Sequence, residues 1–171
     1  MAESLHYMIM ANQASVQKSL LENLKNTGLT IGQPKVLDFL KDHDGSSQKE
    51  IAQGCFLEAG SLTSILNRME EKGLIERRTL NGNRRTFHIF LTEAGKKSQK
   101  LVEQTFTEIE RQALNEISKE EYETFMSVYR KIYENLRRAA DICWQKQIFY
   151  KRVRSNRAAH SILKIITEGT T

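Results

Sequence analysis

Proline and cysteine are scarce in this chain of 171 residues, which has one proline and two cysteines. Cys55 and Cys143 lie far apart, so they do not form the disulfide framework of a small secreted domain. No segment approaches the roughly 20 apolar residues that a membrane-spanning helix needs. The N-terminus also lacks the basic segment and apolar block of a signal peptide. We therefore expect a cytoplasmic protein that does not associate with membranes.

The motifs of common enzymes and metal sites are absent as well. No glycine-rich phosphate loop, Gly-x-Ser-x-Gly elbow or His-Glu-x-x-His helix occurs. The four histidines never pair at helical spacing, and there is no Cys-x-x-Cys. These absences predict a protein that is not an enzyme and that needs no metal and no cofactor.

Positive charge is unevenly distributed along the chain, whose net charge is +5. Beyond Cys143 there are six basic side chains and one acidic side chain, whereas the first 143 residues carry equal numbers of each. Any affinity of the main body for nucleic acid must therefore come from local clusters. The basic tail, residues 144–171, is either an additional phosphate-binding extension or a dispensable terminus.

Apolar residues at helical spacing dominate the sequence and predict an α-rich protein with one hairpin. The expected helices are 5–26, 31–43, 47–54, 58–72, 93–115 and 119–143, and the expected strands lie within 74–91. Capping boxes at Thr30, Ser47 and Ser118 mark three helix starts. Short capped helices followed by a hairpin with an Asn-Gly turn are typical of a winged helix-turn-helix.

The last predicted helix carries an unbroken heptad seam of apolar residues. These are Tyr122, Phe125, Tyr129, Ile132, Leu136, Ala139 and Cys143. Such a seam packs either on its own domain or on a second copy of the helix. The dimer is favoured, because long terminal helices exceed what a small winged-helix core can cover. We predict a homodimer whose interface includes Leu5, Ile9, Tyr129, Ile132 and Leu136.

Four segments occur in a characteristic order: LTIGQPKVLDFL, SSQKEIAQ, SLTSILNRMEEKGLIERR and NRRTFHIFLTEAGKK. Together they resemble the MarR family of bacterial transcriptional regulators. The agreement is most specific from Met69 to Gly95, although Met69 replaces the family's leucine and Asn83 replaces its wing aspartate. The resemblance covers residues 5–143. It implies a mainly α fold, a winged helix-turn-helix with N- and C-terminal dimerisation helices.

The expected domain organisation follows from this resemblance. Residues 1–29 form an N-terminal dimerisation helix, and residues 30–92 form the winged helix-turn-helix lobe. Residues 93–143 form the C-terminal dimerisation helices, and residues 144–171 form a basic C-terminal extension.

Three groups of residues are predicted to contact double-stranded DNA. The polar face of helix 58–72 can enter the major groove, where Thr63 can also meet a thymine methyl. The start of the third helix can contact phosphates, and the arginine-rich wing suits the minor groove. The residues are Gly60, Ser61, Thr63, Ser64, Asn67 and Arg68 on the helix, Ser47, Gln48 and Lys49 at the helix start, and Arg78, Asn83, Arg84 and Arg85 on the wing. By resemblance, Arg85 is the minor-groove residue and Arg84 a phosphate contact. The alternative is a polar face and a charged strand that are merely solvated.

The resemblance implies a sequence-specific regulator, usually a repressor, that binds an inverted-repeat operator as a homodimer. Two alternatives remain, a winged-helix module for protein–protein contact and a non-specific DNA-binding protein. Four wing arginines argue against the first, and short polar residues on the recognition helix argue against the second.

Regulators of this family often respond to a small aromatic effector. His6, Tyr7, Met8, Met10 and Phe39 either line an effector cavity or form part of the core. Redox control is another hypothesis, for which Cys55 is the better of the two cysteines, although a free cysteine is usually a small buried hydrophobe.

Overall fold

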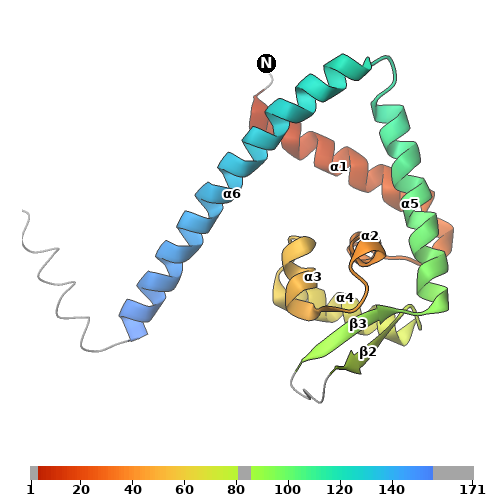
Figure 1. The fold of residues 1–171 in the computed structure, drawn as a ribbon, viewed down its shortest axis with the longest axis vertical. Helices are drawn as coiled ribbons and strands as arrows, with labels where there is room; N and C mark the ends of the chain where they lie inside the picture. Colours follow the sequence, from red (N-terminus) through yellow and green to blue (C-terminus); the bar gives the residue numbers. More distant parts are fainter. Residues whose placement is uncertain (1–3, 81–85, 156–171) are drawn as a thin grey trace, which may run out of the picture. The chain divides into compact units, whose positions relative to one another are not determined.

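The computed structural model describes residues 4–80 and 86–155, and the chain divides into two compact units, Met1–Asn115 and Glu116–Thr171. In the first unit the helices are α1 (Leu5–Asn23), η1 (Lys25–Thr27), α2 (Gln33–Asp42), α3 (Gln48–Gly54), α4 (Ala59–Glu71) and α5 (Glu93–Ala113) (Figure 1). Its strands are β1 (Ser46–Ser47), β2 (Ile75–Thr79) and β3 (Phe87–Leu91). The second unit contains α6 (Lys119–Ser155).

The three strands form an antiparallel sheet in the order β1-β3-β2. The hairpin of β2 and β3, the wing, was predicted, and its register pairs Arg77 with Ile89 and Thr79 with Phe87. The two-residue strand β1 was not predicted, because two serines carry no alternating pattern. The mainly α winged helix-turn-helix fold is confirmed, and the dimerising role of the terminal helices stays a prediction.

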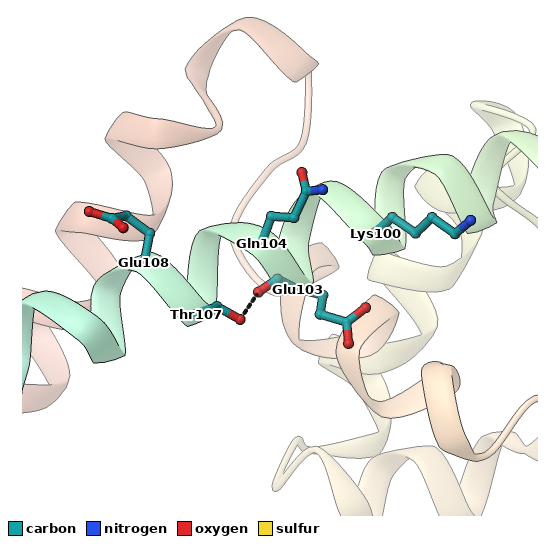
Figure 2. Close-up of a pocket in the computed structure, with 5 residues that line it drawn as sticks. All are labelled: Lys100, Glu103, Gln104, Thr107 and Glu108. Atoms are coloured by element: carbon teal, nitrogen blue, oxygen red, sulfur yellow. Dashed lines mark hydrogen bonds between the residues drawn. The ribbon is translucent and has the colours of Figure 1, made fainter.

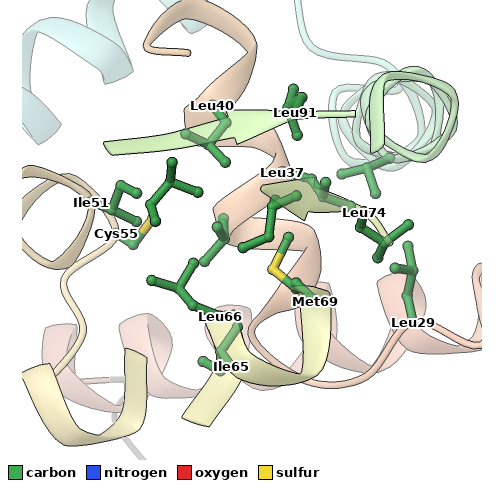
Figure 3. Packing of buried hydrophobic residues seen from close by; sticks show 14 of the residues in the cluster. Leu29, Leu37, Leu40, Ile51, Cys55, Ile65, Leu66, Met69, Leu74 and Leu91 are labelled. Carbon is green, nitrogen blue, oxygen red and sulfur yellow. The ribbon is translucent and has the colours of Figure 1, made fainter. Parts of the chain in front are cut away.

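One hydrophobic core holds the first unit together (Figure 3). Leu37 and Leu40 of α2 pack with Ile51 of α3 and with Leu66 and Met69 of α4. Because side chains alternate along a strand, β3 sends Ile89 and Leu91 into this core. The core therefore fixes the helix-turn-helix and the base of the wing as one body.

Two of the three predicted capping boxes form. Ser47 accepts a hydrogen bond from the backbone N–H of Glu50, whose carboxylate accepts one from the N–H of Ser47 at 2.7 Å. Ser118 and Glu121 exchange the same pair of bonds at the start of α6. Each box satisfies two N–H groups that the first helical turn leaves open.

The third capping box was predicted wrongly. Helix α2 begins at Gln33, and its N-cap is Gly32 with a φ of 89°. Gly32 has a left-handed backbone conformation in a turn that the N–H of Gln33 closes onto the Thr30 carbonyl at 3.0 Å, so a right-handed helix begins only after it. Gln33 still accepts a hydrogen bond from the Thr30 N–H at 3.0 Å, so half of the box survives inside a turn.

Helix α6 is longer than predicted. The heptad seam indicated an end near residue 143, but the helix continues to Ser155. The sequence between them contains no proline and no glycine that would stop it. Within residues 4–80 and 86–155, no helix is both long and apolar enough to span a membrane.

Gly95 offers a direct test of this packing. A Cβ added there would lie 1.9 Å from the carbonyl oxygen of Leu74, which is backbone and cannot rotate away. We expect Gly95→Ala to lower the free energy of unfolding by about 1–3 kcal/mol or more through overpacking. Urea denaturation at one fixed protein concentration measures this loss.

Gly60→Ala is the matched control. Its added Cβ meets nothing within 4 Å, and Gly60 also lies in the first turn of a helix. Alanine there should raise stability by about 0.5 kcal/mol, because it restricts the unfolded chain. Equal stability of the two variants would show that the approach of Gly95 to Leu74 is not tight in solution.

Candidate nucleic-acid interface

Helix α4 presents the predicted recognition face. Its apolar side is buried, with Leu62, Leu66 and Met69 inaccessible to solvent. The predicted DNA-contacting residues all lie exposed on the rest of the helix: Gly60, Ser61, Thr63, Ser64, Asn67 and Arg68. An amphipathic helix with small polar side chains outward can approach the edges of base pairs closely.

The recognition face is not a set of free side chains. Gln48, at the start of α3, donates from Nε2 to the hydroxyl of Thr63 at 2.5 Å. Arg68 donates from Nε to the carbonyl oxygen of Ser64 at 3.2 Å. The structure thus joins two predicted contact residues from different helices, Gln48 and Thr63, and their surfaces are continuous.

The start of α3 is less open to phosphate than the sequence suggested. The Glu50 carboxylate accepts hydrogen bonds from both the backbone N–H and the hydroxyl of Ser47. These bonds lower the pKa of Glu50, and the bond from the Ser47 hydroxyl has the larger effect. The carboxylate therefore remains charged beside the helix start. Ser47 is therefore occupied by an internal anion, whereas Lys49 is exposed and enters no ion pair among residues 4–80 and 86–139.

Arg77 fastens the wing to the recognition helix, a role that the sequence did not reveal. It forms an ion pair with Glu70 and donates from Nη2 to the side-chain oxygen of Asn67 at 2.7 Å. Asn67, a predicted DNA contact, therefore has its oxygen engaged and only its NH₂ group left to donate. The available signal was strand alternation, because Arg77 faces the same side as the buried Ile75.

Arg78 points to the other face of the wing. It pairs with Glu76, and its guanidinium lies 4.9 Å from the centre of the Phe90 ring. Its side chain remains 55% exposed, so it can exchange Glu76 for a phosphate. Asn83, Arg84 and Arg85, the predicted contacts at the wing tip, lie outside the described residues.

The predicted dimer residues are incompletely covered within the chain. On α1, Leu5 is exposed and Ile9 is half-buried. On α6, Tyr129 and Leu136 are exposed and Ile132 is half-buried. The rings of Phe125 and Tyr129 stack at a centroid distance of 5.3 Å, which makes a continuous apolar surface along the predicted seam.

The predicted effector residues do not line any of three hollows found among the described residues of the first unit. Two of these hollows bear on the candidate site. One is a polar groove along α5, where Thr107 donates to the Glu103 carbonyl at 3.0 Å (Figure 2). The other adjoins the recognition helix and is lined by Leu21, Thr30, Ile31, Ser61, Ser64, Ile65 and Arg68.

Cys55 is buried between α3 and α4 and donates to the Lys35 carbonyl at 3.6 Å. Burial raises the pKa of the Cys55 thiol to about 11. Since the thiolate is the reactive form, this raised pKa keeps the thiol protonated and unreactive at neutral pH. This geometry favours a structural thiol over a redox sensor.

Comparison with known proteins places this geometry in context. Residues 27–86 match the family model described as MarR family. The HTH-type transcriptional regulator SarZ of Staphylococcus epidermidis is 27% identical over 124 residues, 72% of this chain and 81% of the relative. The organic hydroperoxide resistance transcriptional regulator of Bacillus subtilis is 31% identical over 91 residues, 53% of this chain and 62% of the relative. The S. aureus MepR–DNA complex superposes with a TM-score of 0.71 at 24% identity, covering 78% of this chain and 96% of MepR.

The two arginines of β2 should differ in how much they contribute to the free energy of unfolding. Arg77→Ala removes an ion pair in which the arginine is 19% and the glutamate 40% exposed, together with a hydrogen bond to Asn67, so we expect it to lower the free energy of unfolding by about 1 kcal/mol. Arg78→Ala removes a solvent-exposed pair and should change stability by less than about 0.5 kcal/mol. Urea denaturation of both variants measures this, and equal losses would contradict the role of Arg77 as the fastening of the wing.

Proposed function

Because this chain resembles the MarR family in its family-model match, its relatives and its fold, we propose that it is a sequence-specific DNA-binding transcriptional regulator and not an enzyme. The observation that carries the proposal is the exposed polar face of α4, joined through Gln48 to the start of α3 and flanked by a basic wing. In this arrangement α4 enters the major groove, and the wing follows the adjacent backbone into the minor groove. The MepR structure, a DNA complex of the same fold, supports it.

The regulator acts as a homodimer in this proposal. The apolar seam of α6 and the outer part of α1 are surfaces that a second copy would cover. Two recognition helices related by a two-fold axis read two half-sites about one duplex turn apart. The operator is therefore an inverted repeat.

We further propose that the protein is a repressor in the cytoplasm and that a small aromatic effector releases it from DNA. The hollow beside α4 supports this part, because Ser64 and Arg68 both line it and lie on the recognition face. A molecule bound there would compete with, or reorient, side chains that we assign to DNA.

DNA binding can be measured by fluorescence anisotropy with the duplex upstream of the chain's own gene, beside a scrambled duplex, at two salt concentrations. We expect a preference of about 10³-fold or more for the first duplex and weaker binding at higher salt. Equal binding to both duplexes would favour the non-specific protein, or would mean that the chain does not regulate its own gene. No binding to either would favour the protein–protein module.

Arg85→Ala tests the wing in the same assay. Loss of one DNA contact from each protomer should weaken binding and reduce the salt dependence by about two counterions per dimer, without loss of fold. Arg111→Ala is the matched control, since it removes the same charge from α5, where Arg111 pairs with Glu108. Unfolding of Arg85→Ala would instead identify that residue as structural.

Leu136→Glu tests the dimer. The side chain of Leu136 is 56% exposed on the seam, so a carboxylate harms the isolated helix little but repels its copy across a two-fold axis. We expect monomers in sedimentation or light scattering, with the helical content unchanged. Lys119→Glu, at the exposed start of α6, is the charge control. An intact dimer of Leu136→Glu would refute the seam as the interface.

A further inference from the structure

The hydroxyl of Thr63 already makes two hydrogen bonds inside the protein. Its proton goes to the carbonyl oxygen of Ala59, one turn earlier in α4, at 2.8 Å. Its oxygen accepts from Gln48 Nε2 at 2.5 Å. A hydroxyl has one proton to donate, so it has none left to offer to a base.

These two bonds also determine which way the Gln48 amide faces. Because the Thr63 proton is donated to Ala59, the amide atom facing Thr63 must itself be a donor. The NH₂ group therefore faces Thr63, and Gln48 holds the side chain from α3 while the carbonyl of Ala59 holds it from within α4. Thr63 has a single side-chain torsion, so fixing its oxygen fixes its methyl group as well.

Thr63 differs in this respect from its hydroxyl neighbours on the recognition face. Ser64 makes one longer bond, to the Gly60 carbonyl at 3.4 Å, and has no methyl group. Ser61 is exposed and has no hydrogen bond among those of the described residues. Thr63 is thus an exposed residue whose hydroxyl is already hydrogen-bonded within the protein and whose methyl group is the other end of its side chain.

We propose that Thr63 reads the 5-methyl group of a thymine through its own methyl, and that Gln48 is the positioning residue that turns the hydroxyl away from the base. The inference rests on the proposed function and deepens it by naming the base feature that α4 recognises. Apolar contact is how proteins distinguish thymine from the other bases in the major groove, apart from its O4 acceptor. A threonine that donated a hydrogen bond to a base would instead need its proton free.

The experiment uses the full-length chain and a duplex that the protein itself selects from a pool of random 30-base-pair duplexes. Each thymine of that duplex is then replaced singly by deoxyuridine, which lacks only the methyl group. The readout is the ratio of the dissociation constants for the uracil and the thymine duplex. This ratio reports methyl recognition and is unaffected by a uniform change in affinity.

We expect the effect at one pair of thymines, one in each half-site, related by the two-fold axis. Uracil in one half-site should weaken binding by about four-fold, and uracil in both half-sites by about fifteen-fold, because each replacement removes one methyl contact. Thr63→Val keeps a methyl without the hydroxyl and should retain this ratio. Thr63→Ser keeps the hydroxyl without the methyl and should bring the ratio to about one. Gln48→Ala should reduce the ratio. The control Thr105→Ser loses the same methyl group on α5, where the Thr105 hydroxyl donates to the Leu101 carbonyl at 2.8 Å, and should leave the ratio unchanged.

The outcomes separate the inference from the function on which it rests. Selection of a duplex with no methyl-sensitive thymine overturns the methyl reading alone, as does a Thr63→Ser variant that keeps the ratio. An unchanged ratio in Gln48→Ala overturns the positioning role of Gln48. Failure of the wild-type chain to select any duplex overturns the proposed function, and the inference with it. Circular dichroism of each variant verifies that it is folded.

Discussion

The geometry of the winged helix-turn-helix lobe depends on one close backbone contact, the approach of Gly95 to the carbonyl of Leu74. The same carbonyl accepts a hydrogen bond from the N–H of Thr92, and the Thr92 hydroxyl donates to Gly73 while it caps α5. The end of α4, the base of the wing and the start of α5 therefore meet within a few atoms. No side chain larger than hydrogen fits at position 95, so the Leu-Thr-x-x-Gly pattern is a packing requirement. It sets the direction in which the wing leaves the recognition helix.

Much of this architecture follows from local sequence rules. The boxes at Ser47 and Ser118 formed as predicted because a serine and a glutamate three residues apart can satisfy each other without help from the rest of the chain. The box predicted at Thr30 does not form, because Gly32 takes a left-handed conformation in a turn between Thr30 and Gln33 and the helix starts after that turn. The fastening of Arg77 to Glu70 and Asn67 escaped prediction because it joins elements whose relative placement only the folded core determines. The polar face of α4 was predictable by position, but not which of its groups are already bonded.

That last distinction changes what the recognition surface can do. From the sequence alone, Ser47, Thr63 and Asn67 are polar groups available to DNA. In the structure each is already hydrogen-bonded: Ser47 to Glu50, Thr63 to Gln48 and Asn67 to Arg77. A group already paired gains little by exchanging its partner for a base, since one hydrogen bond is traded for another. In the proposed function, specificity at such positions would come from shape and apolar contact, and exposed cations such as Lys49 would supply the attraction to phosphate. Cys55, buried with its thiol protonated, adds to the core and not to this chemistry.

The internal bonds also hold α4 along its whole length. Thr63 ties the first half of the helix to α3, Asn67 ties its middle to the wing through Arg77, and Lys72 at its end donates to the carbonyl of Gly28. The helix cannot rotate about its axis without breaking at least one of these bonds, and a rotation by one residue, about 100°, would expose apolar side chains in place of part of the polar face. A bonded recognition helix loses little side-chain entropy when it enters the groove, because the ordering has occurred during folding. In the proposed function, the rigidity of α4 would help a small surface to discriminate between sequences.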